Sequence, residues 1–119
     1  MTKRQEGEPF ARITSLEAQE IIEQDPNSVQ VVDVRNPDEY ESGHVANSIN
    51  IPVNDVLSRF SELPTEKTLL FICQMGGRSG LACEMVAAMG VDPDLIYNIE
   101  DGTPVWIENN LPTNQGSNP

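Results

Sequence analysis

The sequence predicts an α/β fold in which a parallel sheet carries helices on both faces. Two apolar runs, at residues 30–34 and 68–73, have the composition of strands that are buried on both sides. An amphipathic segment over residues 79–89 follows the second run after a loop that contains two glycines. Strand-like and helix-like segments alternate along the chain, and this order favours parallel strands joined by crossover helices.

The length favours one domain. A chain of 119 residues, 38% of them hydrophobic, can build one compact core but not two ordinary ones. Residues 1–9 and 113–119 are polar and lack periodicity, so we expect two mobile tails around a domain spanning residues 10–112.

The first half of the domain contains three recognisable elements. Thr14 and Glu17 have the spacing of a capping box, which predicts a short helix that ends before Asp25. Residues 30–34 form the first predicted strand, and Asp33 is anomalous there because a buried carboxylate needs a partner. Residues 36–39 then offer a cap, a proline and an acid, which together predict a short helical turn.

The second half continues the alternation. We expect a short strand at 49–51, a short helix at 53–60, and a central strand at 68–73 that delivers Cys73 to its carboxyl end. A helix over 79–89 ends at a glycine, and a last short strand at 95–97 precedes a short helix around Trp106.

Charge and cysteine content exclude several classes of function. A formal net charge of −12 opposes binding to nucleic acid phosphates and to anionic lipid. The sequence shows neither a signal peptide nor an apolar run long enough to cross a membrane, so we expect a cytoplasmic protein.

Two cysteines without repeated Cys/His spacing argue against a structural zinc site. A disulfide between Cys73 and Cys83 is formally possible, although it would join a strand end to a helix.

Cys73 is the candidate nucleophile. It stands where a buried strand ends and a helix begins, and in parallel sheets this edge presents unpaired N–H groups and a positive helix dipole. Gly76 and Gly77 allow the backbone to curl into an anion nest, and Arg78 adds a positive charge, so we expect a lowered thiol pKa. The alternative is a small buried hydrophobic residue, the commonest role of a free cysteine.

Three groups of residues resemble the rhodanese family in order and spacing. They are 33–35 with Glu39 and Tyr40, 43–45 with 49–52, and the run Cys73-Gln74-Met75-Gly76-Gly77-Arg78-Ser79. The resemblance covers roughly residues 10–112. It implies a five-stranded parallel sheet and a sulfurtransferase without metal or organic cofactor, in which Cys73 carries sulfur as a persulfide. The implied donors are thiosulfate or a persulfide, and the implied acceptors are cyanide or thiols.

The spacing of the loop separates sulfur from phosphate chemistry. Four residues lie between Cys73 and Arg78, whereas the phosphatases that share this fold have five, which enlarges the cradle for a tetrahedral phosphate. The shorter loop resembles the sulfurtransferases.

Several residues are assigned supporting roles. The loop residues expected to bind substrate are Gln74, Met75, Gly76, Gly77, Arg78 and Ser79. We expect Asp33 to brace this loop, to pair with Arg35, or to do both, and Arg35 itself could reach Glu39 as a structural partner. We expect His44 to be a structural turn residue and Cys83 to be an inert buried thiol.

The substrate and the function class stay open at this point. Gln74 and Met75 would line the mouth of the site, and an apolar Met75 suits a larger thiol or a protein persulfide better than a small dianion. The leading hypothesis is an enzyme. The alternatives are a sulfur carrier for a specific protein partner and a non-catalytic regulatory module.

Overall fold

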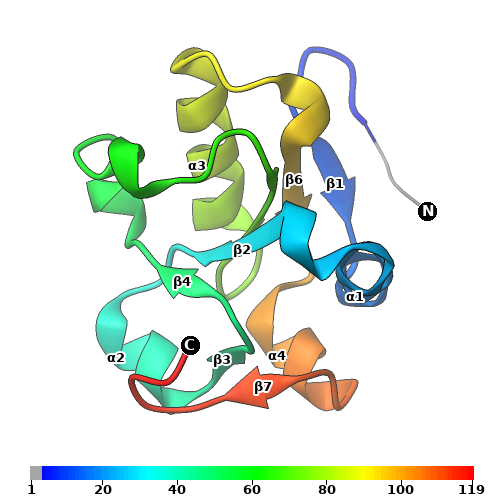
Figure 1. Cartoon of the computed structure of the whole chain (residues 1–119), viewed down its shortest axis with the longest axis vertical. Helices are drawn as coiled ribbons and strands as arrows, with labels where there is room; N and C mark the ends of the chain where they lie inside the picture. The colour runs from blue at the N-terminus through cyan, green and yellow to red at the C-terminus, as the bar shows by residue number, and fades with distance from the viewer. Residues whose placement is uncertain (1–3) are drawn as a thin grey trace.

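The computed structural model describes residues 4–119, so the part of the predicted N-terminal tail at residues 1–3 lies outside the described residues. A five-stranded sheet of entirely parallel strands, in the order β1-β6-β5-β2-β4, forms the centre of the molecule (Figure 1). Its strands are β1 (Ala11–Ile13), β2 (Val29–Asp33), β4 (Ile49–Asn50), β5 (Thr68–Ile72) and β6 (Ile96–Ile99). The predicted α/β class and the five-stranded parallel sheet are both confirmed.

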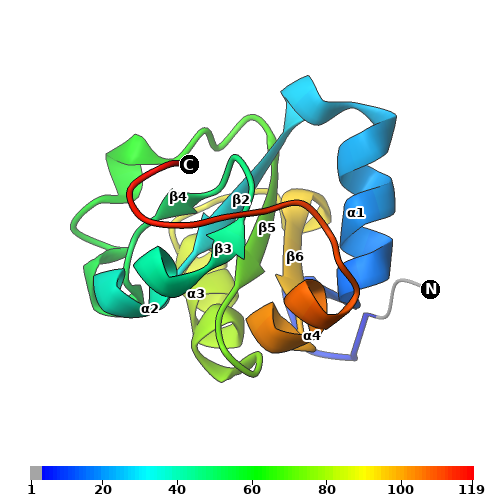
Figure 2. The same cartoon turned by 90° about the horizontal axis from the view of Figure 1, so that it is seen from below.

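Helices cover both faces of this sheet. The helices are α1 (Ser15–Gln24), α2 (Pro37–Ser42), α3 (Gly77–Ala88) and α4 (Gly102–Glu108). Figures 1 and 2 show α3 on one face, with α1 and α4 together on the other. Two apolar cores result, one between the sheet and α3 and one between the sheet and the α1–α4 pair. The central strands are therefore enclosed on both sides, as their composition predicts.

Strand β5 shows how the two cores are divided. Leu69 and Phe71 belong to the core under α3, whereas Leu70 and Ile72 belong to the other core, and all four are 0% exposed. Fully burying side chains of this kind stabilises a fold by about 2 kcal/mol each. Because successive residues of a strand point to opposite faces, Cys73 continues the alternation and lies in the core under α3.

The predicted helix caps are present. The Glu17 N–H donates to the Thr14 hydroxyl at 3.2 Å, and the Thr14 N–H donates to the Glu17 carboxylate at 2.9 Å. Helix α2 begins with Pro37 and also has a capping box, in which the Asn36 N–H donates to Glu39 Oε1 at 3.1 Å. These contacts satisfy N–H groups that the first turn of a helix leaves free.

Three elements differ from the expectation. The helix expected at 53–60 is replaced by two 3₁₀ turns, η2 (Val53–Asp55) and η3 (Phe60–Glu62), because this short segment buries little besides Val56. The fifth strand, β1, was not located from the sequence because three residues are too few to show alternation. Helix α3 begins at Gly77, two residues before the expected start.

The C-terminal segment is packed against the domain, which corrects the mobile tail expected at residues 113–119. Strand β7 (Thr113–Asn114) pairs antiparallel with β3 (His44–Val45). The Gly116 N–H then donates to the Glu41 carbonyl at 2.8 Å. Backbone hydrogen bonds need no apolar side chain, so the polar composition of this segment did not reveal them. Figure 2 shows the segment running alongside β3 and α2.

None of the helices formed by residues 4–119 has the length and apolar character that crossing a membrane requires.

Candidate active site

The loop between β5 and α3 carries Cys73, and the carboxyl end of β5 fixes its start. The Cys73 carbonyl accepts hydrogen bonds from both the N–H and the hydroxyl of Thr103, each at 3.0 Å. Thr103 lies in the first turn of α4, so this helix secures the main chain at the cysteine. Thr103 was not predicted as a site residue, because a lone threonine after a glycine gives no signal for this role.

Only one of the two loop glycines needs to be glycine. Gly76 has a φ of +92°, and a Cβ there would lie 2.5 Å from the Glu100 carbonyl oxygen. Gly77 has no other atom within 4 Å of the position of a Cβ. The expected curl of the backbone therefore depends on Gly76, where a side chain would be strained and would collide with β6–α4 residues.

Gly102 supports the loop from the opposite side. It has a φ of +79°, and a Cβ at this position would lie 1.9 Å from the carbonyl oxygen of Gln74. The backbone of the Cys73 loop thus packs directly on the backbone that leads into α4. A glycine in the segment after the last strand was visible in the sequence, but nothing indicated that it touches the loop.

The sulfur of Cys73 sits among hydrogen-bond donors. The Gly76 N–H donates to Sγ at 3.0 Å, and the Ser79 hydroxyl lies 3.2 Å from Sγ. The residue is only 1% exposed. Sγ is therefore held inside the curl of the loop, at the N-terminal end of α3, where the helix dipole favours negative charge.

These contacts set the ionisation of the thiol. Burial raises the pKa of Cys73, because a charged sulfur loses solvation. Hydrogen bonds from the Ser79 side chain and from the N–H groups of Ser79, Met75 and Gly76 outweigh burial, and the pKa lies below its ordinary value of 9.0. The sequence predicted a lowered pKa, and the structure attributes it to hydrogen bonds from the loop.

Asn98 links the hydroxyl of Ser79 to the loop. Its side-chain oxygen lies 2.6 Å from the Ser79 hydroxyl, and its amide donates to the Gly76 carbonyl at 3.2 Å. The single proton of this hydroxyl goes to Asn98 while Cys73 is a thiol, and it can turn to the sulfur, 3.2 Å away, when Cys73 is ionised. Asn98 is 3% exposed and lies in β6, between apolar neighbours. A polar residue inside a buried strand is the same signal that singled out Asp33, and it could have identified Asn98 from the sequence.

Arg78 does not add a free positive charge to the site. Its two terminal nitrogens donate to the two carboxylate oxygens of Glu39 at 2.8 and 3.0 Å. The side-chain hydrogen bond from Arg78 is the main cause that lowers the pKa of Glu39 from 4.5 to about 2. The loop cation is therefore paired with a carboxylate that is ionised at every physiological pH.

The expected pairing of Arg35 with Glu39 is wrong. Arg35 instead donates to the Asp33 carboxylate through Nε and NH2, at 3.0 and 2.7 Å, and to the Gly43 carbonyl at 2.8 Å. Asp33 is 0% exposed and Arg35 is 3% exposed. Of the two roles left open for Asp33, the ion pair with Arg35 is present, at the point where β2 ends beside Ile72 of β5.

The other loop residues differ in exposure. Gln74 and Met75 are exposed, Met75 by 82%, whereas Ser79 is fully buried. Met75 thus presents an apolar side chain at the crest of the loop that encloses Cys73. The Ser79 hydroxyl is turned toward the sulfur of Cys73, 3.2 Å away.

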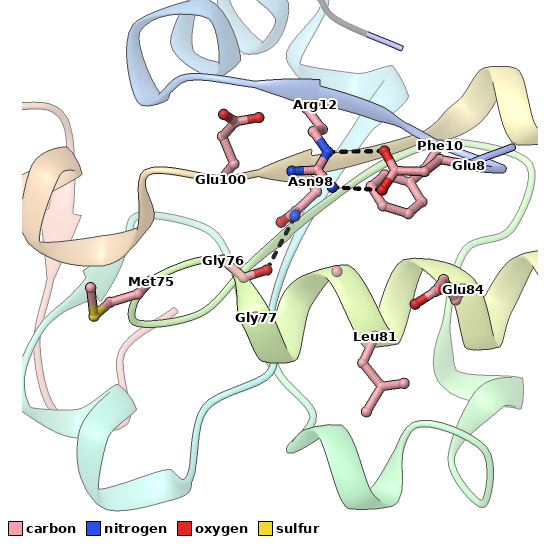
Figure 3. A pocket seen from close by; sticks show the side chains of 11 residues that line it. Glu8, Phe10, Arg12, Met75, Gly76, Gly77, Leu81, Glu84, Asn98 and Glu100 are labelled. Carbon is pink, nitrogen blue, oxygen red and sulfur yellow. Dashed lines mark hydrogen bonds and ion pairs between the residues drawn. The ribbon is translucent and has the colours of Figure 1, made fainter. Parts of the chain in front are cut away.

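A pocket of about 480 Å³ opens beside this loop, between β1, β6 and α3 (Figure 3). Its wall includes Gly76, Gly77 and Asn98 together with Arg12, which pairs with Glu8 at 2.6 Å. Cys73 is not among the residues that line it.

The remaining candidates have structural positions. Both cysteines are free, so the disulfide considered from the sequence is not formed. Cys83 is 0% exposed within α3. The ring of His44 is buried, stacks on Tyr40, and contacts the carbonyl oxygens of Tyr40 and Asn118. Within residues 4–119, no group of three His, Cys, Asp or Glu side chains is arranged to hold a metal ion.

Comparisons with known proteins agree with this arrangement. The model of the rhodanese-like domain family matches residues 14–109. A protein of Bacillus subtilis, YqhL, is 36% identical over 77 residues, which cover 65% of this chain and 60% of YqhL. The thiosulfate sulfurtransferase GlpE of Pseudomonas syringae pv. syringae is 28% identical over 97 residues, 82% of this chain and 87% of that enzyme.

A solved structure is also similar. The rhodanese-related protein of Thermoplasma volcanium is 31% identical and superimposes with a TM-score of 0.73 over 87% of this chain and 96% of that one. The family match spans four of the five strands of the sheet, β2, β4, β5 and β6, together with the loop that carries Cys73 and helices α1 to α4. The chain belongs to the rhodanese-like domain family and has sulfurtransferases among its relatives.

Proposed function

We propose that this protein is a sulfurtransferase that carries sulfane sulfur as a persulfide on Cys73. The observation that supports it best is the set of donors around one sulfur atom, with the Gly76 N–H at 3.0 Å and the Ser79 hydroxyl at 3.2 Å. A thiol with a lowered pKa is a nucleophile near neutral pH, because the thiolate is the reactive form.

The transfer has two steps. In the first, the Cys73 thiolate attacks the outer sulfur of a donor. With thiosulfate the donor's S–S bond breaks, sulfite leaves with the bonding electron pair, and a Cys73 persulfide anion remains. In the second, cyanide or a thiolate attacks the outer sulfur, and Cys73 leaves as a thiolate. The N–H groups of the loop stabilise negative sulfur in both steps, so neither step needs a base, a metal or an organic cofactor.

The loop residues have different roles in this mechanism. Gly76 shapes the loop and donates to sulfur, and Ser79 supplies a second hydrogen bond. Gln74, Met75 and Gly77 surround the approach to Cys73 and contact the donor or the acceptor. Arg78 is held by Glu39 beside them. Asp33 and Arg35 support the neighbouring turn. The loop keeps the four-residue spacing that fits sulfur better than a tetrahedral phosphate.

A sulfur carrier for a protein partner is the second candidate. The observation that favours it is Met75, which is 82% exposed at the crest of the loop. An apolar side chain in such a position is better used against a protein surface than against a small anion. In that case the persulfide chemistry is the same, but turnover with small molecules is slow. We propose a cytoplasmic location for either function.

Intact-mass spectrometry tests the proposal directly. Wild type, Cys73→Ala and the matched control Cys83→Ala are incubated with thiosulfate or with cysteine persulfide, and then with cyanide. We expect wild type and Cys83→Ala to gain one sulfur and lose it to cyanide, and Cys73→Ala to gain none. Failure of wild type to gain sulfur from either donor would overturn the proposal, as would equal loading of Cys73→Ala. Fast loading with negligible turnover would favour the carrier.

A further inference from the structure

We propose that Glu39 selects the sulfur donor by neutralising Arg78, so that the site prefers the persulfide of a thiol to dianionic thiosulfate. This inference rests on the proposed function, because it concerns which donor loads Cys73. It assigns Glu39 as a specificity-determining residue that acts through Arg78 rather than on the sulfur.

The ion pair leaves little charge for a substrate. Arg78 places two N–H donors on the two oxygens of Glu39, at 2.8 and 3.0 Å, which is the bidentate geometry that binds a carboxylate most strongly. Glu39 carries its charge throughout the physiological range, since the pKa of its carboxyl is about 2. The pair as a whole is therefore neutral, and an approaching anion meets a dipole instead of a cation.

Glu39 is held in place by the start of its own helix. One of the two oxygens that bind Arg78 also accepts the Asn36 N–H at 3.1 Å. The next residue, Tyr40, is buried and donates its hydroxyl to the Ser48 carbonyl at 2.8 Å, which fixes α2 against the domain. A carboxylate that is anchored in this way does not move aside easily for a second anion.

Within the described part of the chain, no other strong cation replaces Arg78 at the crest of the loop. The four remaining arginines are each paired with a carboxylate, as Arg4–Asp94, Arg12–Glu8, Arg35–Asp33 and Arg59–Glu62. Among residues 4–119, Lys67 is the one lysine or arginine outside an ion pair. It precedes β5, about 20 Å along the strand from Cys73.

The charge of the donor then decides its approach. Thiosulfate brings two negative charges to a thiolate, in a chain whose formal net charge is −12. A persulfide brings at most one charge on its sulfur. When the donor is a protonated persulfide, the Cys73 thiolate attacks its terminal sulfur. The S–S bond of the donor breaks, and the thiolate of the donor leaves with the electron pair. The products are a Cys73 hydropersulfide and a thiolate, so charge and protons balance without another reactant.

Exposed apolar surface beside the site is consistent with such a donor. Met75 is 82% exposed and Leu81 is 47% exposed, and both line the pocket next to the loop. Figure 3 shows Met75 projecting from the loop and Leu81 from α3. The organic part of a thiol persulfide can contact Met75 on the loop, whereas thiosulfate has no such part.

Sulfur loading of the full chain, measured with both donors, tests the inference. The quantity is the rate constant for loading Cys73 by thiosulfate divided by that for cysteine persulfide. Glu39→Gln keeps the shape and the capping interaction of Glu39 but releases the charge of Arg78, so we expect this ratio to rise about tenfold. Glu41→Gln removes the same charge from an exposed position of α2, and the ratio should stay within about twofold of wild type.

A second variant separates charge from structural damage. In Glu39→Gln/Arg78→Gln the site is neutral again, as in wild type, so the ratio should return to about the wild-type value. An unchanged ratio in Glu39→Gln, or a wild-type protein that loads faster from thiosulfate than from cysteine persulfide, would overturn this inference and leave the sulfurtransferase proposal standing. Absence of loading from both donors would instead overturn the proposed function itself.

Discussion

Cys73 and Cys83 are both hidden from solvent, 1% and 0% exposed, and both lie in the core under α3, yet their surroundings differ completely. Cys73 receives hydrogen bonds from the loop, and the pKa of its thiol is lowered. Cys83 lies inside α3, where burial is the main cause that raises the pKa of its thiol well above 9.0. The nearby charge of Glu84 acts in the same direction. Burial alone therefore does not make a cysteine inert, because donors aimed at the sulfur can outweigh it.

Selective alkylation is the strongest test of this contrast. We expect iodoacetamide at pH 7 to modify Cys73 more than about a hundred times faster than Cys83, because only Cys73 has a substantial thiolate fraction. Peptide mapping after a short exposure of the folded protein measures both rates. Similar rates would show that access, and not ionisation, controls both thiols. Alkylation of the denatured protein is the control, and there the two rates should converge.

Gly76→Ala should raise the pKa of the Cys73 thiol and lower its alkylation rate, so that Cys73 becomes more like the unreactive Cys83. The new Cβ would lie 2.5 Å from the Glu100 carbonyl oxygen in a left-handed conformation, so the loop must shift and its N–H must leave the sulfur. A lost hydrogen bond to a charged sulfur is worth about 2 kcal/mol, and the resulting rise in the thiol pKa corresponds to a roughly thirtyfold lower alkylation rate of Cys73 at pH 7. Gly77→Ala is the matched control, since its Cβ meets nothing within 4 Å, and its rate should equal that of wild type. Equal rates in both variants would show that the curl of the loop is not needed.

Ser79→Ala removes one donor and leaves the loop in place. A hydrogen bond to a charged group contributes about 1.5 kcal/mol, so the alkylation rate of Cys73 at pH 7 should fall about tenfold. The pH at half-maximal rate should move upward, and the rate at high pH should be unchanged. Ser58→Ala, which removes an exposed hydroxyl, is the control. A parallel drop at every pH would indicate lost access rather than a changed ionisation.

The contrast between the two cysteines also shows which features of the site can be predicted from the sequence. The apolar run before Cys73 and the glycines after it predicted a strand end, an anion nest and a lowered pKa, because these depend on local chain geometry. The Asp33–Arg35 pair was among the alternatives that the sequence offered, because the two residues are neighbours in the chain. The partner of Arg78 was not predictable, since Glu39 lies 39 residues away from it. Asn98 and Gly102 reach the loop only through the pairing of β5 with β6 and the entry of α4. Long-range contacts of this kind have no local signal.

The smallest expected effect is on the free energy of unfolding, and it compares two carboxylates. Glu39 binds Arg78 in the segment that follows Cys73, and Glu84 is the neighbour of Cys83 in α3. The folded-state pKa of Glu39, about 2, lies below its ordinary value of 4.5, so its charge stabilises the fold above about pH 4.5. This contribution is lost as the pH falls from about 4.5 toward 2. The pair is partly exposed, so we expect Glu39→Gln to lower the free energy of unfolding at pH 7 by only about 1 kcal/mol.

Urea denaturation between pH 3 and pH 7 measures this difference. It should narrow toward pH 3, because protonated glutamic acid and glutamine both lack the charge that binds Arg78. Glu84→Gln is the control, since this exposed carboxylate has no ion pair among residues 4–119 and should show no such dependence. A constant difference across this range would mean that Glu39 stabilises the domain through the cap of α2 and not through Arg78. The loop at Cys73 would then depend on its own hydrogen bonds alone, which would sharpen its contrast with the interior of α3.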